Sequence, residues 1–116
     1  MPQKPHFAAL AAYNAWANER LYAAAAALPD EAYRRNLGLF FRSVHGTLNH
    51  LLATDRIWLK RLTRTGEAPD RLDAILFEDF AALRAARQAE DARLAAFIQS
   101  LGEDAFSQPV DYKNIA

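Results

Sequence analysis

His50 and the side chains spaced around it are the part of this sequence best suited to chemistry. Ser43, Thr47, His50 and Thr54 follow one another at spacings of four, three and four residues, so a helix carries them on one strip of its surface. Small hydroxyl side chains leave room beside a histidine, as the wall of a pocket does, and Trp58 borders the same strip. The pattern predicts a pocket lined by Ser43, Thr47, Thr54 and Trp58. A lone helical histidine is more often a surface or core residue than a ligand, so that alternative stays open.

The other candidate ligands do not form a motif by spacing alone. The sequence has no cysteine, which excludes disulfides, thiolate nucleophiles and Cys-ligated zinc. His45 precedes His50 by five residues and points away from it on a helix, so the two cannot hold a metal as an i,i+4 pair. His6 has no partner nearby in the sequence.

Polar residues interrupt the apolar positions of the expected helices. Asn14 and Asp55 lie at similar heights on two neighbouring helices, which predicts a structural hydrogen bond between them or from Asp55 to Trp16. Arg87 and Glu90 interrupt a third helix, where they either pair with each other on a partly solvated face or line a polar pocket at mid-bundle. We expect Asn14 and Asp55 to fix helix register rather than to act in catalysis.

Three long helices must position these residues. Apolar periodicity predicts helices over residues 5–28, 39–64 and 77–101, and the breaks at Pro29, Gly66 and Gly102 end them. Short connections between them predict antiparallel neighbours. The sequence therefore indicates one all-α domain over residues 1–116, an antiparallel up-and-down bundle. The first helix is expected to face the bundle with a stripe of residues at alternating steps of three and four: Phe7, Leu10, Asn14, Ala17, Leu21, Ala24 and Leu28.

Composition excludes several function classes. Hydrophobic residues make up 52% and charged residues 24%, which is typical of a globular protein rather than a disordered one. Fourteen basic and fourteen acidic residues give a net charge of zero, so no nucleic-acid partner is expected. The sequence shows no signal peptide and no continuous apolar stretch of membrane-spanning length, so we expect a cytoplasmic protein without a membrane partner.

Three runs of residues resemble the DinB-like family of bacterial proteins. They are Tyr-Asn-x-Trp-x-Asn at residues 13–18, Ser-x-His-Gly-Thr-Leu-Asn-His at residues 43–50, and Asp-Arg-x-Trp at residues 55–58. Helical periodicity alone does not dictate these combinations. The third expected helix is similar to the family's third long helix, so the resemblance covers nearly the whole chain.

The resemblance implies a four-helix bundle of up-down-down-up type, often dimeric, with a divalent metal ion, zinc or nickel, held by three histidines. His50 matches one ligand, and the other two come from a His-x3-His pair on a later helix. This sequence contains no such pair. We therefore expect three of the four long helices here and a domain that is incomplete at its C-terminus.

Two functions follow as hypotheses. The first is a metal-dependent enzyme, a thiol-dependent transferase or a related isomerase or hydrolase, which uses a low-molecular-weight thiol and a small-molecule substrate. The second is a noncatalytic module, a shortened paralogue without a metal, that forms a homodimer through its exposed apolar seam.

Overall fold

Helices account for most of the described part of the chain, and loops and one isolated bridge join them. The computed structural model describes residues 2–107, within which α1 (Lys4–Ala26), α3 (Val44–Thr63) and α4 (Phe80–Ser100) are the long helices. A short α2 (Asp30–Arg34) follows α1, and a 3-10 helix (Glu103–Ser107) follows α4. The all-α class is confirmed. None of the helices described has an apolar stretch long enough to cross a membrane.

Side-chain caps explain why two helices begin later than expected. Ser43 accepts a hydrogen bond from the backbone N–H of Gly46, so α3 begins at Val44 rather than at residue 39. Asp79 caps α4 in the same way by accepting from Ala82. The preceding residues 39–42 form a tight turn instead of helix, closed by a bridge between Leu39 and Arg42.

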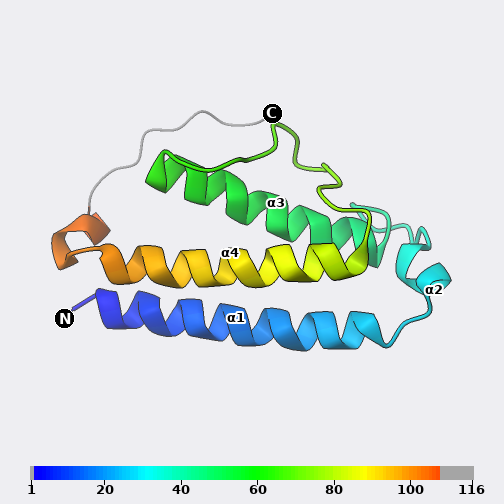
Figure 1. Ribbon diagram of the computed structural model, residues 1–116, viewed down its shortest axis with the longest axis horizontal. Helices are drawn as coiled ribbons and strands as arrows, with labels where there is room; N and C mark the ends of the chain where they lie inside the picture. The colour runs from blue at the N-terminus through cyan, green and yellow to red at the C-terminus, as the bar shows by residue number, and fades with distance from the viewer. Residues whose placement is uncertain (1, 108–116) are drawn as a thin grey trace.

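The long helices do not all alternate in direction. Asn49 near the start of α3 bonds to Phe77 just before α4, and Thr63 at the end of α3 bonds to Arg93 late in α4. The two helices are therefore parallel, and the expectation of antiparallel neighbours is wrong for this pair. The connection between them, residues 64–79, is long enough to cross back over the length of α3 (Figure 1). The order up, down, down agrees with the bundle type that the resemblance implied.

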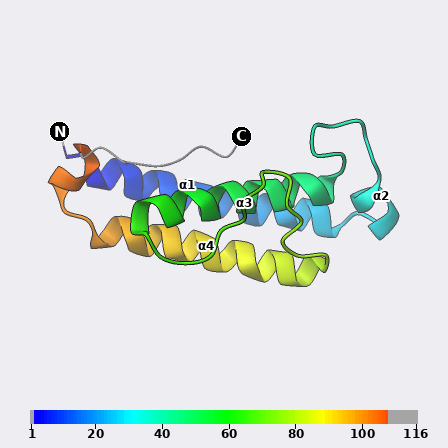
Figure 2. The same cartoon turned by 90° about the horizontal axis from the view of Figure 1, so that it is seen from above.

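Helix α4 is the central element of the bundle. Both α1 and α3 pack mainly against it, and Figures 1 and 2 show the three long helices side by side, with α2 at one end. The apolar core lies near that end, where a cluster of buried side chains joins all four helices: Tyr22, Ala25, Tyr33, Leu48, Leu52 and Leu83. Fully burying side chains of this size stabilises a fold by about 1.5–3 kcal/mol each.

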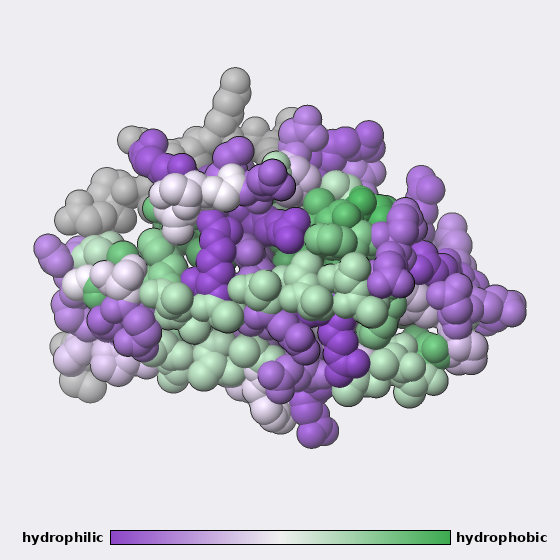
Figure 3. All heavy atoms as spheres, in the orientation of Figure 1, coloured by the Kyte–Doolittle hydropathy of each residue, from purple (hydrophilic) through white to green (hydrophobic). Residues whose placement is uncertain are grey.

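The face of α1 that packs against α4 is rotated from the stripe that periodicity suggested, and the two share Asn14. Its buried residues are Ala11, Tyr22 and Ala25. The leucines of the expected seam remain partly open to solvent, with Leu10, Leu21 and Leu28 exposed by 48%, 42% and 41%. The neighbouring strip, which carries small and polar residues, faces α4 instead. A band of pale apolar spheres along α1 and α4 in Figure 3 marks the alanine-rich face of this pair.

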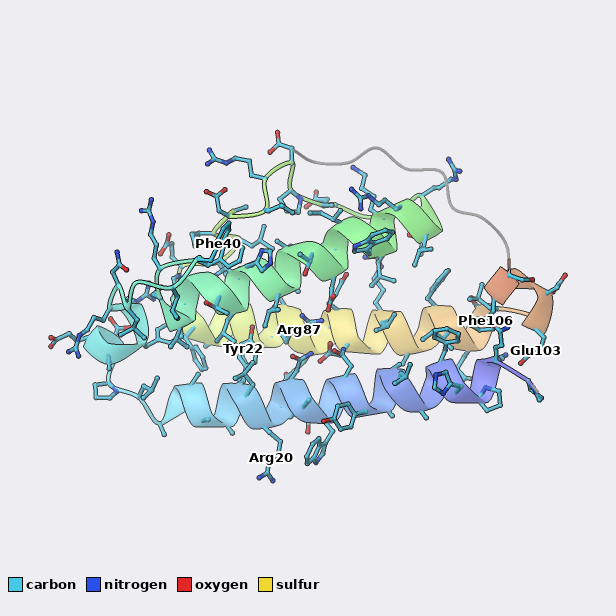
Figure 4. The ribbon with its side chains drawn as sticks, turned by 180° about the vertical axis from the view of Figure 1, so that it is seen from behind. Arg20, Tyr22, Phe40, Arg87, Glu103 and Phe106 are labelled. Atoms are coloured by element: carbon cyan, nitrogen blue, oxygen red, sulfur yellow. The ribbon has the colours of Figure 1, made fainter. Side chains whose placement is uncertain are left out.

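Glu103 fastens the start of α1 to the end of α4. Its two carboxylate oxygens accept the backbone N–H groups of Gln3 and Lys4, each at 2.8 Å. A carboxylate at this position satisfies free donors and complements the positive end of the helix dipole. Phe7 and Phe106 stack with their ring centroids 5.1 Å apart at the same end of the bundle (Figure 4).

Gly46 allows the turn at residues 39–42 to lie directly on α3. A Cβ atom at this position would lie 2.1 Å from the carbonyl oxygen of Phe41, which is backbone and cannot easily move away. We expect Gly46→Ala to lower the free energy of unfolding by about 1–3 kcal/mol, as overpacking does, despite the higher helix propensity of alanine. Urea denaturation followed by circular dichroism measures this change. The control is Gly102→Ala, whose Cβ meets only a flexible carboxylate, and equal stability of the two variants would contradict the prediction.

Candidate functional site

A buried arginine connects the three long helices at mid-bundle. Arg87 of α4 is 2% exposed and donates to Asp55 of α3 and, at 2.7 and 3.1 Å, to Asp91 one turn further along α4. Asp91 in turn accepts from the side-chain amides of Asn14 and Asn18 of α1, both at 3.1 Å. The five side chains form one hydrogen-bonded network, and Figure 4 shows Arg87 between the helices.

The charges in this network stabilise one another. Burial alone lowers the pKa of Arg87, but Asp55 and Asp91 outweigh that effect and raise the pKa above its ordinary value. Tyr22 lies beside the same group, and burial raises the pKa of its phenol to about 12. Arg87 therefore stays charged and Tyr22 stays neutral near neutral pH, which suits a network that holds helix register.

The structure gives Asn14 and Asp55 partners other than those expected. The two residues belong to the same network, but Arg87 and Asp91 lie between them as the bonded groups. Trp16, the alternative partner of Asp55, is 53% exposed on α1. Arg87 and Glu90 do not pair either, because Glu90 binds Arg93 at 3.1 Å. Asp91 and Asn18 were not predicted as members of this network, although each lies four residues from a polar residue that was, Arg87 and Asn14.

The ring of His50 has a defined tautomer. Its Nδ1 lies 2.7 Å from the backbone carbonyl oxygen of Leu72, in the crossover between α3 and α4. A carbonyl oxygen can only accept, so Nδ1 carries the hydrogen and Nε2 of the neutral ring keeps its lone pair. Phe41 stacks on the imidazole with ring centroids 3.7 Å apart. Histidines that bind metals are commonly fixed by such a hydrogen bond from the other ring nitrogen.

The side chains predicted to line a pocket beside His50 share one strip of α3. Ser43 is the buried N-cap, and the hydroxyls of Thr47 and Thr54 donate to backbone carbonyls of the helix, each at 2.9 Å. Trp58 is 43% exposed, with the guanidinium of Arg61 4.7 Å from the centre of its ring. The hydroxyls are thus turned toward their own helix, and a pocket formed by this strip stays a prediction.

A second histidine cluster was missed in the sequence. His45 at the start of α3 is buried, and its Nδ1 lies 2.7 Å from the hydroxyl of Tyr33 on α2. Its Nε2 lies 3.5 Å from the carboxylate of Glu78, which Arg34 also contacts. Burial, and then the charge of Arg34, lower the pKa of His45. Burial also raises the pKa of Tyr33 to about 12, so its hydroxyl keeps its proton. The lowered pKa of His45 favours its neutral imidazole.

Metal ligands are few in the residues that the structure describes. Between residues 2 and 107, no group of three or more histidine, aspartate and glutamate side chains is placed to hold a metal ion. His6 contacts the ring of Phe7 at the start of α1. His50 fits a metal site by its tautomer, but the described residues supply it with no further ligands.

The described residues form a helical bundle in which α3 and α4 are parallel and His50 lies on α3. The sequence model of the DinB family matches residues 1–115, so this chain belongs to the DinB family. Searches among curated proteins and among solved structures found no match.

Removing Arg87 leaves two carboxylates without their cation. We expect Arg87→Met to lower the free energy of unfolding by about 3–5 kcal/mol, the range for breaking a buried ion pair from one side. The control is Arg84→Met on the preceding turn of α4, which should change stability by less than about 1 kcal/mol. Urea denaturation measures both values. An Arg87→Met variant as stable as the control would show that the network does not hold the bundle together.

The lowered pKa of His45 makes folding sensitive to acid. The native state disfavours the protonated ring, so the unfolded chain takes up more protons as the pH falls below about 6.5, the ordinary value for histidine. We expect the wild-type protein to lose stability below pH 6.5 relative to His45→Gln, which cannot be protonated. Urea denaturation at a series of pH values between 5 and 8 tests this. Parallel curves for the two proteins would contradict it.

Proposed function

We propose that this protein is a metal-dependent enzyme in which Nε2 of His50 is one of three histidine ligands to a divalent ion, zinc or nickel. The observation that carries the proposal is the hydrogen bond from Nδ1 of His50 to the Leu72 carbonyl, because it leaves Nε2 with its lone pair and fixes the plane of the ring. The stacked ring of Phe41 restricts the imidazole further. Membership of the DinB family supports the same assignment.

The proposal requires two more histidines, and the His-x3-His pair that the family resemblance implied does not occur in this sequence. We assign these two histidines to a further helix that packs against the exposed leucines of α1 and α3. A metal with three histidine ligands lowers the pKa of a bound water or thiol and so provides a nucleophile at neutral pH. Around it, we expect Thr47 and Thr54 to leave space for substrate and Trp58 to border that space.

The reaction that best suits such a site is a thiol-dependent transfer, with a low-molecular-weight thiol and a small molecule as substrates. Related isomerase and hydrolase reactions use the same type of nucleophile. The equal numbers of basic and acidic residues support small molecules rather than nucleic acid as partners. We place the reaction in the cytoplasm.

A second candidate function is favoured by the exposed seam of α1. Leu10, Leu21 and Leu28 are more than 40% exposed, and Leu51 and Leu62 of α3 are exposed to a similar degree. A noncatalytic module that dimerises through these leucines would bury them without a metal. Sedimentation equilibrium distinguishes the alternatives: a metal-free dimer supports the module, and a well-folded metal-free monomer contradicts it.

Metal content together with intact mass tests the enzyme proposal. We expect the protein, purified without added chelator, to carry about one zinc or nickel ion per chain by inductively coupled plasma mass spectrometry. His50→Ala should lose at least about tenfold in metal affinity, and His6→Ala is the matched control that should keep it. A metal-free protein with an intact mass of 13.0 kDa would overturn the proposal and favour the module.

The tautomer of His50 can be measured directly in the metal-free protein. Long-range proton–nitrogen NMR correlation of the metal-free protein should show the hydrogen on Nδ1 of His50 and a bare Nε2. The opposite tautomer, with hydrogen on Nε2, would remove the observation on which the ligand assignment depends.

A further inference from the structure

A hollow of about 420 Å³ lies beside the turn that precedes α3, and its walls combine aromatic rings with charged groups. Phe40, Phe41 and Arg42 line it from the turn, and Arg71 and Asp73 line it from the crossover. Its volume is within the range of small-molecule sites. None of these residues belongs to the strip of α3 that carries the proposed metal ligand.

The charged side chains that line the hollow are two arginines and one aspartate. Arg71 binds both carboxylate oxygens of Asp73, at 3.0 and 3.1 Å, so one cation and one anion offset each other. Arg42 is a second cation close enough to Asp73 to help lower the pKa of that carboxyl, after the stronger effect of the hydrogen bond from Arg71. The guanidinium of Arg42 is exposed, and it offers several N–H donors to an incoming anion.

The aromatic side of the hollow is unusually open. Phe40 is 92% exposed, and its ring meets that of Phe41 edge to face at 4.8 Å between centroids. A phenylalanine this exposed gains little from folding, so its position on the rim offers an apolar surface to a ligand. Phe41 lies between the hollow and the ring of His50, on which it stacks.

The backbone holds these side chains in place. Leu37 donates to the carbonyl of Arg42 at 2.7 Å, and Arg42 donates to the carbonyl of Leu39 at 2.9 Å. Arg42 itself has a φ of 74°, a left-handed conformation that costs about 1 kcal/mol for a residue other than glycine. A turn closed by two bonds keeps the two phenylalanines and Arg42 ready to bind, without a loop having to become ordered.

We propose that this hollow binds a small aromatic carboxylate. The carboxylate lies against the guanidinium of Arg42, in place of solvent, and the flat ring packs against Phe40 and Phe41. A planar guanidinium fork matches a carboxylate, and an edge-to-face aromatic pair provides a matching surface for a ring. The site holds whether or not His50 binds a metal, and Phe41 both lines the hollow and stacks on the ring of His50.

Benzoate is the probe for a titration of the full chain followed by proton–nitrogen NMR. We expect saturable shifts at the amides of residues 40–42 and 71–75. Benzamide, which keeps the ring and lacks the charge, and acetate, which keeps the charge and lacks the ring, should each bind about tenfold more weakly or worse. Equal affinity for benzoate and benzamide, or no saturable shift, would overturn the proposal.

Variants of the charged and aromatic walls complete the test. Arg42→Asn removes the cation while keeping a residue that accepts a left-handed φ, and it should weaken benzoate binding about tenfold. Phe40→Ala, at an exposed position, should weaken it without loss of fold. The matched control is Arg20→Gln on α1, whose side chain points away from the bundle on the side opposite Phe40 in Figure 4, and it should bind as the wild type does. Unchanged binding by Arg42→Asn and Phe40→Ala would show that the hollow is not the site.

Discussion

The ion pairs of Arg87 are the interaction on which the arrangement of this bundle depends. A guanidinium cannot remain buried without anions, and its two partners come from different places, Asp55 on α3 and Asp91 on α4. Because Asp91 also accepts from Asn14 and Asn18, the same charge cluster fixes α1. One network therefore sets the height of all three long helices relative to one another. A slip of α1 or α3 by one turn along α4 would break these hydrogen bonds.

The network also explains which face of α1 is buried. The two asparagines must reach Asp91, so the strip of α1 that carries them and the small Ala11 turns toward α4. The leucine stripe lies to the side of that strip, and it stays open along with exposed leucines of α3. The polar contact thus takes precedence over the larger apolar residues. An apolar surface free on both outer helices is what a further helix or a second copy would need.

Much of the fold could be predicted from the sequence, and the rest depends on contacts that spacing does not reveal. The three helices follow from periodicity and from breaks such as Pro29 and Gly66. The direction of α4 does not, because residues 64–79 carry no regular pattern that distinguishes a turn from a crossover. The partners of Asn14 and Asp55 were predicted wrongly for a similar reason, since a long arginine side chain joins carboxylates that no helical wheel places together. His50 could be chosen from its neighbours, but the bond that sets its tautomer comes from a loop carbonyl.

The two histidines of α3 show how such contacts determine chemistry. His45 and His50 are five residues apart on the same helix, and nothing in their spacing tells which could bind a metal. At His45 the Tyr33 hydroxyl keeps its proton and donates to Nδ1, which leaves the hydrogen of the neutral ring on Nε2, 3.5 Å from the Glu78 carboxylate. At His50 the Leu72 carbonyl takes the hydrogen of Nδ1 and leaves Nε2 bare. The partners thus give the two rings opposite tautomers, one buried within the bundle and one half-buried. Of these two histidines, His50 has a ring nitrogen with a free lone pair and is partly open to solvent, so the proposed metal site is assigned to it. His45 is buried with a lowered pKa, so the loss of stability in acid is assigned to it.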